Sequence, residues 1–452
     1  MDKMAIYNKL PIPLQDFACS IEGRRLASLR YGSPFDKNLL GYSSNVSLSG
    51  DEVASIRNQK LKTMLRFCYE QVPFYKKLFD DGGVNPYTVI DDRDIIVLPI
   101  LRKNDVREHV DDLRPSDLTK IGKYITEHTS GSTGSSLVFG QSVSNVRDLW
   151  AVFWRFWNLL GIEQGTLCAD FGSRMIVPSS QVEPPFWRCC PPLAQVKFSA
   201  FHANESNYGE FVKAFDEKGL QWIHGYPSCI VPFAAYVLEK GITFAKPIRW
   251  VTTSAENLYD HQRALIKKAF GVDPYSLYAL TEATACISER PDHKMVVDED
   301  YSLVELVESP AGYRIVGSNL GNFAFPLLRY DTGDVCSCSG ERVNGWRVVD
   351  FIDGRSAELV RLPDGGTVGA LSALFTESSS VKEAQIVQHA DYSVTIKFVS
   401  FGEGIDSDIA VARQKFIERT RGLLPVEFKK VELIPRTKRG KLRYVVSEIN
   451  NG

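Results

Sequence analysis

A run of eight Thr, Ser and Gly residues, Thr129–Ser136, is well suited to bind an anion. Its backbone N–H groups and hydroxyls can wrap around a phosphate without any side-chain charge. A flexible linker is the alternative interpretation, but linkers are seldom placed between apolar, strand-like segments such as Tyr124-Ile125 and Leu137-Val138-Phe139. The residues expected to contact phosphate are Thr129, Ser130, Gly131, Ser132, Thr133 and Gly134.

Four further residues have the types and spacing of a metal site. They are Cys286, His293, Cys336 and Cys338, a Cys-x6-His pair and a Cys-x-Cys pair. Four nitrogen and sulfur ligands suit a closed tetrahedral Zn²⁺. The alternative is a set of reduced core cysteines with a surface histidine. Nine cysteines spread over a long chain do not indicate a disulfide framework.

A regular alternation of helices and strands would position these groups. Between residues 208 and 282, helical stretches alternate with apolar strands at 220–223, 248–251 and 275–278. This pattern predicts a parallel sheet covered by helices. Because ligands bind at the carboxyl ends of such strands, the loops Gly225–Ser228, Ser254–Asn257 and Ala279–Glu282 should share one rim.

The remaining chain supplies the surrounding architecture. Ser49-Gly-Asp-Glu52 has the form of a capping box that begins a helix, and Pro73 should end that helix. After residue 300 the sequence becomes rich in strands, and a hinge is expected near Asp353–Glu358. We therefore predict an α/β fold with a large N-terminal domain, residues 1–354. It would combine helix-covered parallel sheets with a β-rich subdomain, and a small α+β domain, residues 355–452, would follow.

Composition narrows the partners and the location. The chain has 452 residues, 53 basic against 55 acidic, with a net charge of −2, so no general attraction to nucleic acid or anionic membrane is expected. We find neither a signal peptide nor an apolar run near the ~18 residues that span a bilayer. A cytoplasmic protein without membrane insertion is the expectation.

Five motifs in a fixed order carry a family resemblance. They are the Thr129–Ser136 loop, Tyr278-Ala-Leu-Thr-Glu282, Tyr330-Asp-Thr-Gly-Asp334, Gly354-Arg355 and Pro435-Arg-Thr-Lys-Arg-Gly-Lys441. In this order they resemble the adenylate-forming superfamily of acyl-CoA synthetases, nonribosomal adenylation domains and luciferases. The chain is most similar to the phenylacetate–CoA ligase branch and its CapK-like relatives from polysaccharide loci.

The resemblance implies that ATP and Mg²⁺ activate a carboxylic acid as its acyl-adenylate. Lys441, Thr281 and Glu282 would be catalytic: Lys441 bridges the carboxylate and the α-phosphate, Thr281 donates to the α-phosphate, and Glu282 binds Mg²⁺. Asp334 would accept hydrogen bonds from both ribose hydroxyls. As a structural alternative, Asp334 is a turn residue, and Lys441 belongs to a solvated basic tail.

The other implied contacts surround the nucleotide and the acid. Adenine would be held by Ser254, Ala255, Glu256, Tyr278 and Ala279, Arg355 would reach the ribose or phosphate, and Gly225, Tyr226 and Leu280 would line the acid pocket. Some family members also resemble this chain in the Cys/His pair and Cys-x-Cys, which would make the zinc structural.

Two departures from the family pattern bear on activity. Ser135-Ser136 stand where Lys-Pro commonly follows the phosphate loop, and Ser356-Ala357-Glu358 replace the usual paired Asp after Gly-Arg. The predicted reaction passes the acyl group to a thiol, most simply that of coenzyme A. The alternatives are transfer to an amine or amino sugar without coenzyme A, and a catalytically silent nucleotide-binding partner. The acid itself and the oligomeric state stay open.

Overall fold

The computed structural model divides the chain into two compact units, which we describe separately. Unit 1 comprises residues 1–25, 165–276 and 353–452, and unit 2 comprises residues 26–164 and 277–352. The structure describes residues 6–449 except 90, 129–136, 173–175, 311, 356–359, 366, 369–370, 376–377, 379, 401–404 and 436–441. The domain boundary at 354/355 stays a prediction.

Unit 1 contains five neighbouring strands of a ten-stranded sheet, in the order β4-β5-β3-β6-β7. The strands are β3 (Cys168–Phe171), β4 (Trp187–Cys190), β5 (Gln195–Phe198), β6 (Trp222–Gly225) and β7 (Trp250–Ser254). All neighbouring pairs are parallel except β4 with β5. The helices between them are α8 (Tyr208–Lys218), α9 (Pro227–Glu239) and α10 (Asp260–Phe270), with short 3₁₀ turns at Pro191–Leu193 and Ala200–His202. The predicted parallel sheet covered by helices is confirmed.

One face of this sheet packs against α8, α9 and α10 in a core rich in phenylalanine. Phe171 and Phe198 stack across neighbouring strands with ring centroids 4.9 Å apart. Phe211 and Phe215 from α8 and Phe233 from α9 close over them. This apolar face fixes the register of the strands and sends the alternate side chains to the opposite face.

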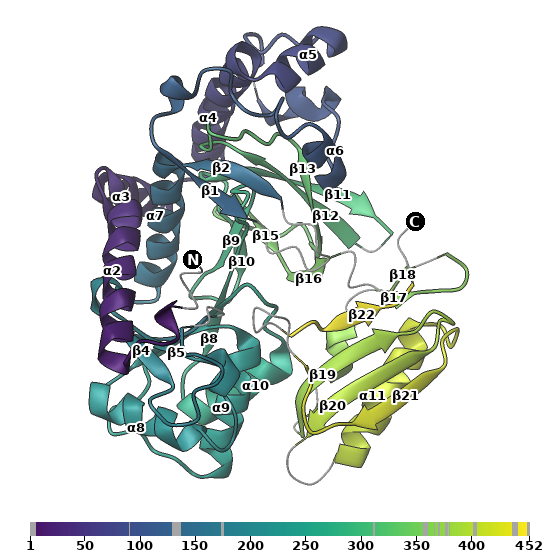
Figure 1. Ribbon diagram of the computed structural model, residues 1–452. Helices are drawn as coiled ribbons and strands as arrows, with labels where there is room; N and C mark the ends of the chain where they lie inside the picture. Colours follow the sequence, from purple (N-terminus) through teal and green to yellow (C-terminus); the bar gives the residue numbers. More distant parts are fainter. Residues whose placement is uncertain are drawn as a thin grey trace. The chain divides into compact units, whose positions relative to one another are not determined.

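The C-terminal part of unit 1 is a small α+β body, as predicted (Figure 1). Its four-stranded sheet has the order β21-β20-β19-β22, formed by β19 (Val381–Gln388), β20 (Val394–Ser400), β21 (Val426–Lys430) and β22 (Val445–Ser447). Helix α11 (Ile405–Arg419) contributes Ala412 and Phe416 to the core beneath the sheet. The short elements β17 (Val360–Arg361), β18 (Thr367–Val368) and η6 (Leu371–Phe375) precede it.

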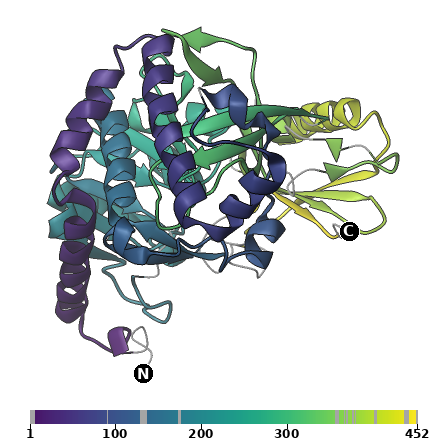
Figure 2. The ribbon, with the colours of Figure 1, turned by 90° about the horizontal axis from the view of Figure 1, so that it is seen from above.

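Helices frame unit 2. They are α3 (Phe35–Asn45), α4 (Gly50–Gln71), α5 (Pro73–Gly82), α6 (Lys103–Glu108) and α7 (Val143–Leu159), with 3₁₀ turns η1 (Asp92–Val97) and η2 (Leu118–Ile121). α2 (Ile12–Tyr31) crosses the unit boundary at Arg25. Helix α3 runs beside α7 (Figures 1 and 2). The predicted capping box is present: the Ser49 hydroxyl accepts from Glu52 N, and the Glu52 side chain accepts from Ser49 N.

The strands of unit 2 include the β-rich part that the sequence predicts after residue 300. They are β9 (Cys286–Glu289), β10 (Met295–Val297), β11 (Ser302–Ser309), β12 (Gly312–Asn319), β13 (Tyr330–Ser337), β14 (Arg342–Val343) and β15 (Trp346–Val349), with the hairpin β1 (Tyr124–His128) and β2 (Val138–Ser142). β8 (Pro274–Ala279) and β16 (Phe351–Arg355) cross the unit boundaries. Strands β11, β12 and β13 are antiparallel neighbours.

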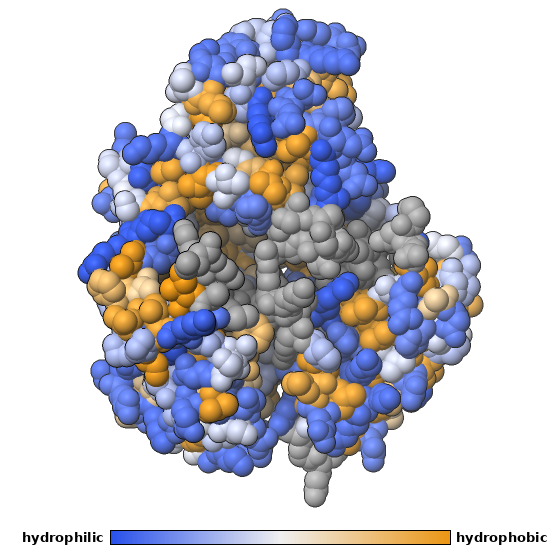
Figure 3. Space-filling view, viewed as in Figure 1, coloured by the Kyte–Doolittle hydropathy of each residue, from blue (hydrophilic) through white to orange (hydrophobic). Residues whose placement is uncertain are grey.

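The face of the molecule drawn in Figure 3 is mainly polar, and its hydrophilic residues surround separate groups of hydrophobic ones. Among the described helices, none has the length and apolar character needed to cross a membrane.

Candidate active site

The loops after β6 and β7 meet through Glu256. Its Oε2 accepts a hydrogen bond from Ser228 N at 3.0 Å, and its Oε1 accepts one from Ser228 Oγ at 2.9 Å. Ser228 lies in the first turn of α9, where backbone N–H groups have no helical acceptor and a carboxylate is favoured by the helix dipole. Glu256 therefore ties two of the predicted rim loops together.

Glu256 also contacts the C-terminal segment of the same unit. Leu442 N donates to Glu256 Oε1 at 3.2 Å, and the rings of Tyr259 and Tyr444 pack with centroids 5.0 Å apart. The contact brings the residue that follows Lys441 to the rim of the parallel sheet. Lys441 itself lies outside the described residues.

The loops after β7 and β8 each contain a non-glycine residue with a left-handed backbone conformation. Ala255, beside Glu256, and Ala283, beside Glu282, have φ values of 64° and 59°. A left-handed conformation costs a non-glycine residue about 1 kcal/mol, and such strain tends to collect at functional sites. At Gly225, φ is 153° and an added Cβ would stand 2.5 Å from Phe171 O, so only glycine fits. Gly225 thus permits close packing of β3 and β6, and the next residue, Tyr226, is the N-cap of α9.

In unit 2, Tyr278 and Asp334 form a hydrogen-bonded pair. The Tyr278 hydroxyl donates to Asp334 Oδ2 at 2.6 Å. Burial, and then the Asp334 carboxylate, raise the pKa of Tyr278 well above its usual value, so the phenol keeps its proton. The turn interpretation is wrong, because Asp334 lies within strand β13. Thr332 Oγ1 accepts a hydrogen bond from Asp334 N at 3.0 Å, so Thr332 holds the backbone of Asp334 and Tyr278 holds its carboxylate.

The segment after β8 is a compact turn. Ala283 N donates to Leu280 O at 3.0 Å, and Asn319 Nδ2 donates to Glu282 O at 3.3 Å. Thr281 is exposed and Glu282 is half-buried, whereas Ala279 ends the strand. The turn therefore leaves the Thr281 hydroxyl accessible to a ligand.

Several predicted residues lie at the edge of what the structure describes. The residues Thr129–Ser136 are outside it, but they connect β1 to β2, whose ends His128 and Val138 pair in an antiparallel hairpin. Arg355 is the last residue of β16. Ser254 ends β7. The nucleotide contacts assigned to these residues stay predictions.

The zinc prediction is not supported, because no three His, Cys, Asp or Glu side chains in the described residues come together as a metal site. The His293 ring instead bonds Glu289 Oε1 at 2.8 Å through Nδ1, and Cys338 Sγ donates to Val348 O at 3.3 Å. Cys286 and Cys336 are fully buried, and burial raises the pKa of the Cys286 thiol, whereas zinc requires a thiolate. None of the nine cysteines, all within the described chain, forms a disulfide.

A buried charge cluster in unit 2 was not predicted. Arg155 of α7 is 1% exposed and forms ion pairs with Asp298 Oδ1 at 2.7 Å and Asp300 Oδ2 at 2.6 Å. The intervening Glu299 pairs with Arg57 at 2.9 Å. These pairs anchor the segment between β10 and β11 to α4 and α7. A run of acidic residues usually indicates a solvated surface, so only its apolar flanks, Val296-Val297 and Tyr301, hinted at burial.

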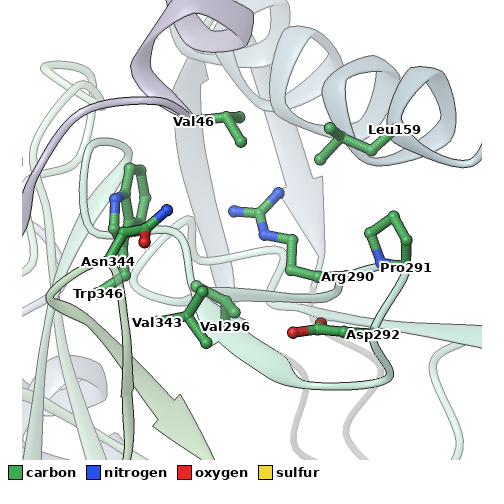
Figure 4. A pocket seen from close by; sticks show the side chains of 9 residues that line it. All are labelled: Val46, Leu159, Arg290, Pro291, Asp292, Val296, Val343, Asn344 and Trp346. Carbon is green, nitrogen blue, oxygen red and sulfur yellow. The ribbon is translucent and has the colours of Figure 1, made fainter.

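Beside this cluster lies a cavity of about 250 Å³ (Figure 4). Its lining residues are Val46, Leu159, Arg290, Pro291, Asp292, Val296, Val343, Asn344 and Trp346. The Arg290 guanidinium points among the apolar walls, while its Nη2 donates to Asp298 Oδ1 at 3.0 Å. None of the predicted site residues is among those that line it, so it carries no part of the site described above.

Comparisons with known proteins agree with the fold. A model of the CapK C-terminal domain matches residues 361–448. Protein CapK of Staphylococcus aureus is 25% identical over 98% of this chain and 99% of its own length. The phenylacetate-coenzyme A ligase of Escherichia coli K12 is 25% identical over 69% of this chain and 73% of its own.

A solved structure covers a similar span. The crystal structure of 2-hydroxyisobutyryl-CoA ligase in the postadenylation state with 2-HIB-AMP superposes with a TM-score of 0.65, at 17% identity, over 88% of this chain and 90% of that one. Sequence and structure together identify the chain as a relative of CapK and of the phenylacetate–coenzyme A ligases, with the fold of the adenylate-forming ligases.

Proposed function

We propose that the protein activates a carboxylic acid with ATP, releasing pyrophosphate, and then transfers the acyl group to a thiol, most simply coenzyme A. The observation that carries this proposal is the contact between Glu256 and Leu442. It places the neighbour of Lys441 at the rim formed by the loops after β6 and β7, where an acyl-phosphate reaction needs a cation.

In the first step, a carboxylate oxygen of the acid bonds to the α-phosphorus of ATP. The bond from that phosphorus to the bridging oxygen breaks, and pyrophosphate leaves with the electron pair. Lys441 would stabilise the negative charge that develops on the α-phosphate, and Thr281 would donate its hydroxyl there. Asp334, held by Tyr278, would accept hydrogen bonds from the ribose hydroxyls.

Mg²⁺ fits the residues at the turn after β8. Glu282 is a half-buried carboxylate next to the exposed Thr281 hydroxyl, and such hard oxygen donors suit an ion that keeps several of its waters. When bound, it would neutralise phosphate charge. The phosphate loop at 129–136 would hold the β- and γ-phosphates, since it joins the paired ends of β1 and β2.

In the second step, the sulfur of the thiol attacks the acyl carbonyl carbon, AMP leaves, and the thiol proton passes to solvent. The relatives named phenylacetate-coenzyme A ligase and the solved acyl-CoA ligase favour this acceptor. Transfer to an amine is the second candidate, because CapK, whose name specifies no thiol acceptor, matches 98% of the chain, whereas the phenylacetate-coenzyme A ligase covers 69% of it.

The test is pyrophosphate release from ATP and Mg²⁺ with a panel of aryl, fatty, hydroxy and amino acids. Lys441→Ala should abolish release, whereas Lys430→Ala, which removes an exposed lysine of β21 in the same domain, should leave it unchanged. Adding coenzyme A or hydroxylamine to the active mixture then identifies the acceptor. If ATP binds and no acid gives pyrophosphate, the protein is a silent nucleotide-binding partner and the proposal is wrong.

A further inference from the structure

Four polar side chains form a row across the parallel strands of unit 1. Lys197 on β5, Asp170 on β3, His224 on β6 and Thr252 on β7 stand opposite one another in register. Side chains at the same level of neighbouring parallel strands point to the same face of the sheet. The residues that alternate with them lie in the phenylalanine-rich core, so this polar row occupies the face opposite α8, α9 and α10.

The polar row lies at the carboxyl edge of the sheet. Asp170 and His224 each precede the last residue of their strand. The Asp170 carboxylate extends still further along the chain direction, because its Oδ1 would stand 2.9 Å from a Cβ added to Gly172. Thr252 precedes the loop that carries Glu256 by two residues. The row therefore borders the rim at which the proposed reaction takes place.

The groups in the row are charged or hydrogen-bonded, and all but the buried Thr252 are partly exposed. Lys197 Nζ lies 2.5 Å from Asp170 Oδ2, and the two side chains are 19% and 13% exposed. His224 Nδ1 lies 2.8 Å from Thr252 Oγ1, which also accepts from Trp222 Nε1 at 2.9 Å. Burial lowers the pKa of His224, so its imidazole is neutral near pH 7.

Stability alone does not account for these residues. A largely buried ion pair often contributes no more than an apolar pair of the same size, because desolvation offsets the attraction. An apolar row would complete this face at lower cost. Burial acts to raise the pKa of Asp170, but the charge of Lys197 outweighs it, and the carboxyl stays ionised. Such groups at the edge of a site are typical of ligand recognition.

We propose that the polar row recognises a hydroxyl or amino group on the carboxylic acid substrate. The inference rests on the proposed function and names its substrate class: acids with a hydrogen-bonding substituent, in preference to plain hydrocarbon acids. Asp170 accepts a hydrogen bond from the substituent, and Lys197 or the neutral His224 forms the second hydrogen bond to the same substituent. A polar site of this kind rejects the hydrocarbon analogue, because a hydrocarbon substituent would cover the Asp170 carboxylate and the His224 ring without offering them a hydrogen bond.

The experiment compares acids that differ only at the substituent, such as 4-hydroxyphenylacetate with 4-methylphenylacetate and 3-aminobenzoate with 3-methylbenzoate. The readout is the ratio of kcat/KM for pyrophosphate release within each pair. We expect the wild-type ratio to exceed about 100 for the preferred pair. The double variant Asp170→Asn/Lys197→Met keeps the shape and removes both charges, and it should lower that ratio at least 10-fold.

Thr253→Val is the matched control, because Thr253 is the next residue of β7 and lies on the opposite face of the sheet. It should leave the ratio unchanged. A wild-type ratio near 1, or a ratio that survives the double variant while its thermal unfolding matches wild type, overturns the inference. If no acid releases pyrophosphate, calorimetric binding of the same pairs decides. If the protein then binds the acid with the polar substituent selectively, the inference holds and the proposed function is wrong. If it binds both acids of a pair equally, both are wrong.

Discussion

The hydrogen bond from Tyr278 to Asp334 allows a quantitative prediction. Tyr278→Phe removes the phenolic hydroxyl and leaves the ring, so the change isolates the 2.6 Å bond to Asp334 Oδ2. Hydrogen bonds to charged groups contribute about 1.5–3 kcal/mol, and each 1.4 kcal/mol changes an equilibrium constant tenfold. The largest effect on ATP affinity is therefore on the order of 100-fold.

The structure favours the lower end of that range. The backbone of Asp334 stays fixed in the variant, because Thr332 Oγ1 still accepts from Asp334 N at 3.0 Å. Only the orientation of the carboxylate is loosened. We expect the KM for ATP to rise about 10-fold with little change in kcat, since binding of the ribose is equal in ground and transition states.

The assay is pyrophosphate release at varied ATP, repeated with 2′-deoxy-ATP. In wild type, loss of a ribose hydroxyl should weaken binding, and in Tyr278→Phe this discrimination should shrink. Tyr301→Phe is the control. Tyr301 is also buried in unit 2, but its hydroxyl accepts only a long hydrogen bond, 3.5 Å, from Asn145 Nδ2. A KM for ATP within twofold of wild type, with unchanged discrimination, would refute the role of the pair in holding ribose.

Two further predictions concern stability. Arg155→Leu leaves Asp300 buried without its cation and leaves Asp298 paired with Arg290 alone. It should lower the free energy of unfolding in urea by about 3–5 kcal/mol, whereas Arg25→Leu, in an exposed pair, should lower it by less than about 1 kcal/mol. Equal losses would contradict this account of the cluster. Burial lowers the pKa of His261 from 6.5 to about 4, so the neutral ring contributes stability that is complete above pH 6.5 and is lost as pH falls toward 4, by about 3 kcal/mol. His261→Gln should flatten the dependence of unfolding free energy on pH in this window. An unchanged slope would mean that other titrating groups cause the loss of stability in acid.

Local signals in the sequence predicted whether each main element is a helix or a strand, but they predicted its first and last residues less well. The capping box at Ser49 placed the start of α4 correctly, because capping depends on residues three apart. The strand expected at 220–223 is Trp222–Gly225. Leu220 misled the prediction, because it is buried in the core without being part of the strand. An apolar residue indicates burial, but the neighbouring strands decide whether that residue is hydrogen-bonded as part of a strand.

The site was predictable where a motif is local and unpredictable where partners are distant. The loops after β6 and β7 were expected at one rim, and Glu256 joins them. Its second contact, with Leu442, links residues 186 positions apart and left no local signal. The same limit explains the zinc prediction, because cysteine spacing does not show that Cys286 is buried beside Arg155 and Asp298.

The discontinuous make-up of unit 1 has a consequence for how the chain is synthesised. Gln15 of α2 and Arg188 of β4 are both buried, and Gln15 Oε1 accepts from Arg188 Nε at 2.7 Å across 173 residues of sequence. At ribosomal rates of about 5–20 residues per second, α2 emerges roughly 9–35 s before its partner strand exists. During that interval the helix face that contains Gln15 is not yet buried. It is exposed to solvent together with Leu14, Phe17 and Ile21, which stay exposed even in the finished fold. The nascent α2 is therefore a segment at which a chaperone would be expected to act early.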